Sequence, residues 1–162
     1  MFEILGLYGI QKPILDAIQL LYTNNTSTVL SPDGETPPID IKAGILQGDT
    51  LAPFLFIMVV DYVLRMSLDK SKEKGLEIKP RTSPRNPAKF ITDTDFADDI
   101  SLISSSLLDA QELLSSLEGA ANCVWLYLNE SKTEFMNLTT TTTTFNMKTL
   151  NGYILKCVED YK

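Results

Sequence analysis

Four aspartates lie within seven residues of one another in the stretch "TDTDFADDISLIS". They are Asp93, Asp95, Asp98 and Asp99. Crowding like charges beside apolar segments raises the free energy of the ionised carboxylates, and a bound cation would offset that cost. The chain has no histidine, and its two cysteines, Cys123 and Cys157, show no CxxC spacing. Oxygen ligands without nitrogen or sulfur ligands favour a hard cation, Mg²⁺ or Mn²⁺.

The geometry of this acidic stretch decides whether its carboxylates can act together. Successive residues of a straight strand point to opposite faces, so Asp98 and Asp99 share a site only in a tight turn. The apolar runs on both sides predict two short strands joined by such a turn, with Phe96 anchoring one side and Ile100 and Leu102 the other. Aspartate is also a common turn former, so the pair alone does not establish a site.

Two further segments carry residues that could contact a ligand. In "GILQGDTLAPFLF", Gly44 and Gly48 let the backbone approach a ligand closely, and Gln47 offers both a donor and an acceptor. In "LNESKTEF", Lys132 sits in a polar turn before a strand, where its ammonium could reach an anionic substrate. Taken singly, the first segment is an ordinary helix entry and the second an ordinary solvated lysine.

Composition excludes several classes of chemistry. A chain of 162 residues with 44% hydrophobic and 22% charged residues is long enough for one folded domain. Without histidine, Ser-His, Cys-His and His-metal sites are excluded. The net charge of −7 disfavours general binding to phosphate backbones, so nucleic-acid binding would depend on a local patch.

Half of the basic residues lie within positions 70–89, where three prolines also occur. This composition predicts a basic loop, and Lys79, Arg81 and Arg85 are its candidate nucleic-acid contacts. A solvated connection without function is the competing interpretation of the same loop.

Hydrophobic periodicity and turn signals predict the elements that position these residues. A first helix is expected over 13–22 and a third over 107–124. A second helix is expected to start after Asp49 or Thr50, either of which can cap it. This second helix is apolar on nearly all faces, so we expect it to be deeply buried. Hairpins are expected over 27–45 and over 145–158, the latter turning at Asn151-Gly152. "TEFMNL" is predicted to form a strand, and the threonines at 139–144 either extend it or form a link. The order predicts an α+β fold with an antiparallel sheet and helices on one face.

The N-terminus shows no signal-peptide pattern, and the apolar run "FLFIMVV" is too short to span a bilayer. We therefore expect an intracellular chain, nuclear or cytoplasmic, with no membrane partner.

Taken in order, the three segments resemble the reverse transcriptase palm of non-LTR (LINE-like) retrotransposons. "GILQGDTLAPFLF" is similar to the QG-LxP-LF motif of that family, "FADD" to its YADD motif, and "LNESKTEF" to its LN-x-x-KTE motif. Phe96 stands where the family usually has tyrosine. The resemblance covers nearly the whole chain as one partial palm domain, 1–162, with incomplete fingers and thumb.

This resemblance implies an RNA-directed DNA polymerase that uses two-metal nucleotidyl transfer with Mg²⁺ or Mn²⁺. Asp98 and Asp99 would be the catalytic, metal-binding pair, with Asp98 the more direct ligand, and Lys132 would lie near the departing pyrophosphate. The nucleotide and template pocket would be lined by Gln47, Gly48 and Phe96. The implied partners are an RNA template, a DNA primer and deoxynucleoside triphosphates, and the hairpin Leu150–Val158 would border the primer end.

The resemblance also implies a further catalytic aspartate, in an upstream motif ending in "AFD" that this chain begins just after. Asp16, the only aspartate before the first hairpin, lies in a predicted helix and is no substitute. We therefore expect no primer extension by the isolated chain, and an unpaired sheet edge that favours self-association. The alternatives are a catalytically dead remnant that binds nucleic acid weakly through residues 70–89, and an interaction domain without a site.

Overall fold

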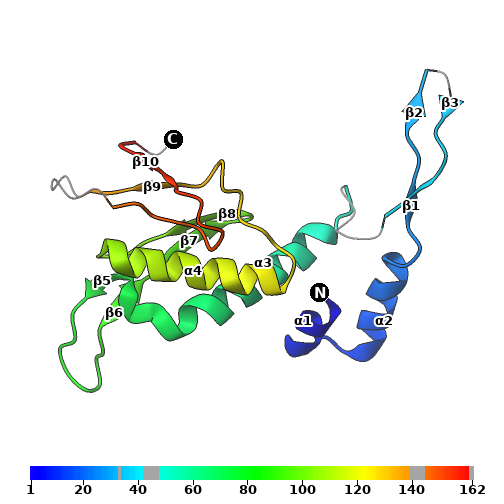
Figure 1. The fold of residues 1–162 in the computed structure, drawn as a ribbon. Helices are drawn as coiled ribbons and strands as arrows, with labels where there is room; N and C mark the ends of the chain where they lie inside the picture. Colours follow the sequence, from blue (N-terminus) through cyan, green and yellow to red (C-terminus); the bar gives the residue numbers. More distant parts are fainter. Residues whose placement is uncertain (33, 42–47, 139–144, 161–162) are drawn as a thin grey trace. The chain divides into compact units, whose positions relative to one another are not determined.

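The computed structural model describes residues 1–32, 34–41, 48–138 and 145–160. They form a mixed α+β structure in which helices accompany short, mostly antiparallel strand pairs (Figure 1). The chain divides into two compact units, Met1–Val59 and Val60–Lys162, and each is described by itself. Among the described residues, no helix combines the length and apolar character needed to cross a membrane.

The first unit is built on two short helices, α1 (Phe2–Leu7) and α2 (Lys12–Leu21). Pro13 lies in the first turn of α2, where its missing N–H is not needed. The core joins Leu5 of α1, Ile18 of α2 and Leu55 at the start of α3 (Ala52–Leu68). The predicted helix over 13–22 is therefore confirmed. Its apolar face packs against α1 and the start of α3 through Ile18.

A two-part hairpin follows α2. Strand β1 (Thr26–Ser27) pairs antiparallel with β4 (Ile39–Asp40), and β2 (Leu30–Ser31) pairs antiparallel with β3 (Gly34–Glu35). The predicted hairpin over 27–45 is confirmed where it is described, and its last residues lie outside the described residues. Of the two cap candidates before α3, Asp49 accepts the backbone N–H of Leu51 at 3.0 Å.

The expectation that α3 is deeply buried is wrong for part of its surface. Leu55 is 2% exposed, whereas Phe54 is 67% and Ile57 51% exposed. A helix that is apolar on all faces still buries only the stripe that meets a packing partner. Val60, Val63, Leu64 and Leu68 are buried like Leu55, whereas Met66 is exposed together with Phe54 and Ile57.

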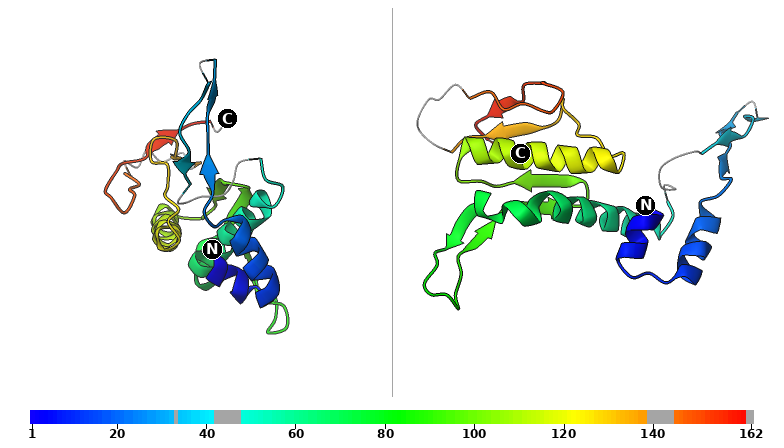
Figure 2. Two further views of the ribbon diagram at one scale, coloured as in Figure 1. Left: turned by 90° about the vertical axis from the view of Figure 1, so that its right-hand side faces the viewer. Right: turned by 60° about the horizontal axis from the view of Figure 1, so that its bottom comes forward.

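The second unit contains the acidic hairpin. Strands β7 (Asp93–Phe96) and β8 (Asp99–Leu102) pair antiparallel, and helix α4 (Leu107–Cys123) follows them. The core joins Leu114 of α4 to Met147 and Leu155, with Leu102 of β8 packed against it. Helix α4 lies alongside β7, β8 and the C-terminal strands (Figures 1 and 2). The helix predicted over 107–124 and the paired strands around the acidic turn are confirmed.

The C-terminal segment forms a hairpin and then a strand. Lys148 bridges Ile154, the N–H of Leu155 donates to the carbonyl of Met147 at 2.9 Å, and Gly152 has φ +82°. The predicted turn at Asn151-Gly152 is confirmed, but the hairpin pairing runs from Met147 to Leu155 and not over the whole of 145–158. Beyond it, β10 (Lys156–Val158) pairs in parallel with β9 (Glu134–Met136), the predicted "TEFMNL" strand. The six threonines, 139–144, lie outside the described residues.

The basic loop predicted over 70–89 is largely ordered. It holds a short 3₁₀ helix, η1 (Asp69–Lys74), strand β5 (Leu76–Lys79) and the start of β6 (Lys89–Ile91). Strands β5 and β6 pair antiparallel, so the segment is a two-stranded ribbon and not an irregular connection. The three prolines lie between the strands, where they remove no ladder hydrogen bond.

Candidate active site at the turn between β7 and β8

The turn between β7 and β8 is a two-residue loop. Phe96 pairs with Asp99, which leaves Ala97 and Asp98 at the tip. Ala97 has φ +58°, a left-handed value that non-glycine residues seldom adopt. Tight two-residue hairpin turns require positive φ at the first central position, so this geometry is what the short loop demands. The predicted tight turn is confirmed, and it carries Asp98 and Asp99 as adjacent, exposed residues.

The register of the hairpin assigns three of its four aspartates to a face of the strand pair. Asp93 lies opposite Leu102 and Asp95 lies opposite Ile100. Residues that lie opposite each other in an antiparallel pair project from the same face. Asp93 and Asp95 therefore lie on the face of Ile100 and Leu102, whereas Asp99 lies on the other face.

Phe96 does not anchor the turn, contrary to the expectation from sequence. Its side chain is 84% exposed and lies on the face of Asp99. The hairpin is held instead by Leu102, which packs against Leu114 and Met147. The register explains the difference, because it places the aromatic ring on the face that the apolar core does not cover.

The two aspartates of β7 influence each other. Loss of solvent contact raises the pKa of Asp95, and a hydrogen bond with Asp93 together with the negative charges of Asp93 and Asp61 raises it further. Asp61 belongs to α3 and also pairs with Arg65 at 2.8 Å. These carboxylates form an acidic group on β7 and α3, separate in the hairpin register from the turn that carries Asp98 and Asp99.

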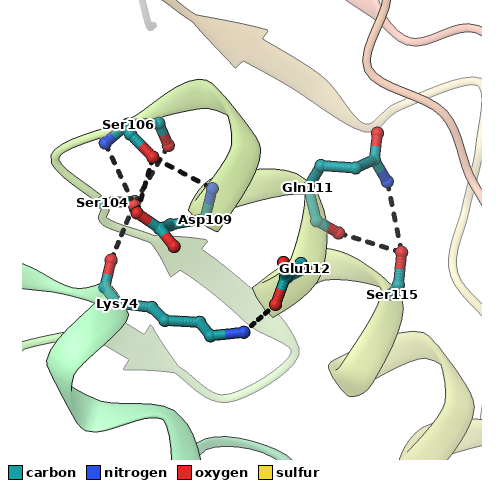
Figure 3. A network of polar contacts seen from close by, with 7 residues as sticks. All are labelled: Lys74, Ser104, Ser106, Asp109, Gln111, Glu112 and Ser115. Carbon is teal, nitrogen blue, oxygen red and sulfur yellow. Dashed lines mark hydrogen bonds and ion pairs between the residues drawn. The ribbon is translucent and has the colours of Figure 1, made fainter.

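The base of the hairpin is fixed by hydrogen bonds between η1, the β8–α4 connection and α4 (Figure 3). Ser104 donates its hydroxyl to the carbonyl of Lys74 at 2.7 Å. Ser106 caps α4 by accepting the N–H of Asp109 at 3.1 Å, and Lys74 forms an ion pair with Glu112. Sequence reasoning missed this network, although a serine three residues before an acidic residue at a helix start is a known capping signal.

The turn fits a hard divalent cation in its donor chemistry. Asp98 and Asp99 supply carboxylate oxygens, which are the ligands that Mg²⁺ prefers, and both side chains are exposed. Across residues 1–32, 34–41, 48–138 and 145–160, no group of three histidine, cysteine or acidic side chains is close enough to hold a metal ion. Mg²⁺ usually keeps several waters and binds through one or two carboxylates plus substrate phosphates, so a pair of ligands suits it.

The sequence comparisons assign this structure to a family. The family described as reverse transcriptase (RNA-dependent DNA polymerase) matches residues 8–151. The chain belongs to the reverse transcriptase family. It is 30% identical over 132 residues to the retrovirus-related Pol polyprotein from type-2 retrotransposable element R2DM of Drosophila melanogaster. That match covers 81% of this chain and 11% of the polyprotein, and it supports a reverse transcriptase domain of the non-LTR retrotransposon type.

Other residues expected in the site of this reverse transcriptase domain lie on separate elements. Gly48 belongs to the first unit and has φ +89°, and Gln47 lies outside the described residues. Lys132 is exposed in a turn before β9, where its backbone N–H donates to the carbonyl of Asn129 at 3.1 Å. Lys79 ends β5, and Arg81 and Arg85 lie exposed between β5 and β6.

A contact that the sequence did not reveal lies beside Gly48. The hydroxyl of Tyr22 donates to the Asp49 carboxylate at 3.0 Å, which ties the end of α2 to the entry of α3. Burial raises the pKa of Tyr22, and the hydrogen bond and charge of Asp49 add to this rise. The residues are 27 positions apart, so no local pattern signals the pair.

Proposed function

We propose that this reverse transcriptase domain contributes the catalytic aspartates of an RNA-directed DNA polymerase. The observation that carries the proposal is the two-residue turn, which places the exposed Asp98 at its tip and the exposed Asp99 at the first position after it, in a chain of this family. Nucleotidyl transfer depends mainly on positioning and on neutralising phosphate charge, and a rigid acidic turn suits that task.

In this proposal Asp98 and Asp99 hold the divalent ion, Mg²⁺ or Mn²⁺, with Asp98 the more direct ligand. A bound ion would neutralise negative charge on the reacting phosphates. Lys132 would interact with the departing pyrophosphate, and Gln47, Gly48 and Phe96 would line the nucleotide and template side. The substrates would be deoxynucleoside triphosphates, with an RNA template and a DNA primer that ends near the hairpin Leu150–Val158.

We further propose that the strands and helices of the chain assemble in a palm-like arrangement. The support is that the three segments "GILQGDTLAPFLF", "FADD" and "LNESKTEF" occur in the same order as the motifs of this family that they resemble. Two-stranded ladders such as β7–β8 leave backbone donors and acceptors unpaired along their outer edges. Self-association through such an edge is a further expectation, and a measured molar mass above 18.1 kDa would support it.

Two-metal transfer requires carboxylates from more than one element. Because no third carboxylate joins Asp98 and Asp99 within the part of the chain that the structure describes, we expect the purified chain to show no primer extension. The same observation favours a second candidate, a catalytically dead remnant that binds nucleic acid weakly. The two candidates differ in whether the turn still binds a metal ion.

Magnesium-dependent stability separates these candidates. Chemical denaturation with and without Mg²⁺ should show a gain of about 2.7 kcal/mol at a hundredfold excess over Kd. Asp98→Asn should abolish the gain, whereas Asp16→Asn, which alters an exposed surface ion pair, should retain it. A wild-type chain that Mg²⁺ does not stabilise, or an equal gain in Asp98→Asn, would contradict metal binding at the turn.

A further inference from the structure

The β5–β6 ribbon concentrates positive charge on one scaffold. Lys79 lies directly opposite Lys89, so the two ammonium groups project from the same face of the ribbon. Arg81 and Arg85 lie in the exposed connection between the strands. In Figures 1 and 2 this connection extends away from α4 as a long loop.

These four cations lie close together on one ribbon and, within the described residues, are not neutralised by ion pairs. Ion pairs are made elsewhere by Lys12, Arg65, Lys72, Lys74 and Lys156. Like charges directly opposite one another destabilise a strand pair, so folding alone does not favour lysine at both positions. An anion shared by Lys79 and Lys89 would offset this repulsion.

The tip of the ribbon is held by its own hydrogen bonds. The N–H of Asn86 donates to the carbonyl of Ser83 at 3.1 Å, which closes a turn around Pro84 and Arg85. The N–H of Thr82 donates to the carbonyl of Asn86 at 3.2 Å, and the Asn86 amide donates to the Thr82 hydroxyl at 2.8 Å. The cations are therefore presented on an ordered hairpin, which lowers the entropic cost of binding an extended anion.

The chemistry of the ribbon points to phosphates. Guanidinium and ammonium groups bind phosphate oxygens well, and arginine can do so with two parallel hydrogen bonds. The one aromatic residue of β5 and β6 is Phe90, which lies opposite Glu77 and directly follows Lys89. Successive strand residues point to opposite faces, so the face that carries Lys79 and Lys89 offers no platform for stacking unpaired bases. The chain as a whole carries a net charge of −7, so its surface outside the ribbon would repel a nucleic acid.

We propose that the β5–β6 ribbon is a binding site for the phosphate backbone of a nucleic-acid duplex, independent of base sequence. A duplex is favoured over a single strand because its phosphates are more closely spaced along the axis. The site is separate from the proposed metal-binding turn and requires neither Asp98 nor Asp99.

The test uses the whole chain, a fluorescently labelled duplex of mixed sequence, low salt and no divalent metal. The test variant carries Lys79→Gln, Arg81→Gln, Arg85→Gln and Lys89→Gln. The control variant carries Lys12→Gln, Lys72→Gln, Lys148→Gln and Lys156→Gln, which changes the net charge by the same amount. Unfolding curves establish that both variants are folded.

We expect the test variant to bind at least about tenfold more weakly and the control less than about twofold more weakly. The slope of log K against log salt should fall by about 3 to 4 in the test variant, because each lost phosphate contact contributes about 0.9. Asp98→Asn should bind the duplex as the wild type does, so failure of the metal-binding proposal would leave this result unchanged.

Four results would overturn the proposal. They are equal losses in the test and control variants, no duplex binding by the wild-type chain at low salt, tighter binding of a single strand than of the duplex, and equally tight ribbon-dependent binding of polyglutamate. The last result would instead identify an acidic protein surface as the partner.

Discussion

The side-chain amide of Gln111 in α4 pairs with the backbone of Lys148 as a neighbouring strand would. Its Oε1 accepts the N–H of Lys148 at 2.8 Å, and its Nε2 donates to the carbonyl of the same residue at 2.7 Å. Two turns along the helix, the buried carboxylate of Glu118 accepts the N–H of Leu150 at 2.7 Å. The C-terminal hairpin is thereby attached to α4 through its backbone.

Replacing Gln111 with leucine should weaken this attachment. Both backbone groups of Lys148 would lose their partner, and because Lys148 is exposed, water can replace part of the interaction. We expect the free energy of unfolding to fall by about 1 to 2 kcal/mol in urea denaturation. Gln19→Leu, at an exposed position of α2, is the matched control and should stay within about 0.5 kcal/mol of the wild type. Equal stability of Gln111→Leu and the control would show that the paired hydrogen bonds do not stabilise the hairpin.

Trp125 occupies a backbone position that suits glycine. At the end of α4 the N–H of Leu126 donates to the carbonyl of Ala121 and the N–H of Trp125 to that of Asn122, a Schellman motif. Trp125 itself has φ +63° and is 81% exposed. Trp125→Gly should therefore relieve backbone strain, lose little packing and raise the thermal midpoint, with a gain of up to about 1 kcal/mol. Trp125→Ala keeps the strained Cβ and is the control; an equal effect of both variants would exclude the strain.

Local signals in the sequence were sufficient for the helices and turns. Asn151-Gly152 predicted the C-terminal turn, Pro13 marked the start of α2, and the apolar repeat predicted α4. The tight turn that carries Asp98 could also be predicted, because apolar runs flank a short polar stretch. In each case the information lies within a few residues of the feature that it determines.

Features that depend on distant residues could not be predicted. The Gln111–Lys148 pair joins residues 37 positions apart, and β9 pairs with β10 across an intervening hairpin. Phe96 has an apolar side chain, but which face of the hairpin is covered depends on the packing of Leu102 against α4. Residues 70–89 were predicted as a basic loop because their three prolines break any helix, whereas these prolines lie only in the connection between β5 and β6.

The raised pKa of Asp95 predicts a pH-dependent stability. Because the folded-state pKa lies above the ordinary value of 3.8, ionised Asp95 destabilises the native state at pH values above its folded pKa. As pH falls through the folded pKa the native state binds a proton, and the cost decreases until the pH lies below the ordinary value of 3.8. Asp95→Asn should be more stable than the wild type at pH 7, by less than about 1 kcal/mol because the side chain is exposed.

Unfolding in denaturant at pH 7 and at pH 3.5 checks this expectation. The difference between Asp95→Asn and the wild type should become much smaller at the lower pH, which lies below the ordinary pKa of 3.8, because the carboxyl is then largely protonated in both states. Asp40→Asn, an exposed substitution in β4, is the control for loss of one negative charge. A gain for Asp95→Asn that persists at pH 3.5 would show that its cause is not the titration of the carboxyl.

Two glycines should respond in opposite directions to alanine. Gly75 joins η1 to β5, and a Cβ there would collide with the backbone oxygen of Ile91. Gly119 lies inside α4, where a Cβ would meet only the Cδ1 of Leu150 at 4.0 Å, an ordinary van der Waals contact. Gly75→Ala should therefore cost about 2 kcal/mol or more, since the β5–β6 pair must shift. Gly119→Ala should stabilise the chain by about 0.5 to 1 kcal/mol through its higher helix propensity.

Chemical denaturation of both variants under one set of conditions measures the two effects against a common wild type. The same substitution at both positions makes each variant the control for the other. Because β6 pairs with β5 at the base of the basic ribbon, Gly75→Ala should also weaken duplex binding, and Gly119→Ala should not. A stable Gly75→Ala variant with unchanged unfolding would mean that β5 does not approach Ile91 as closely as the structure describes.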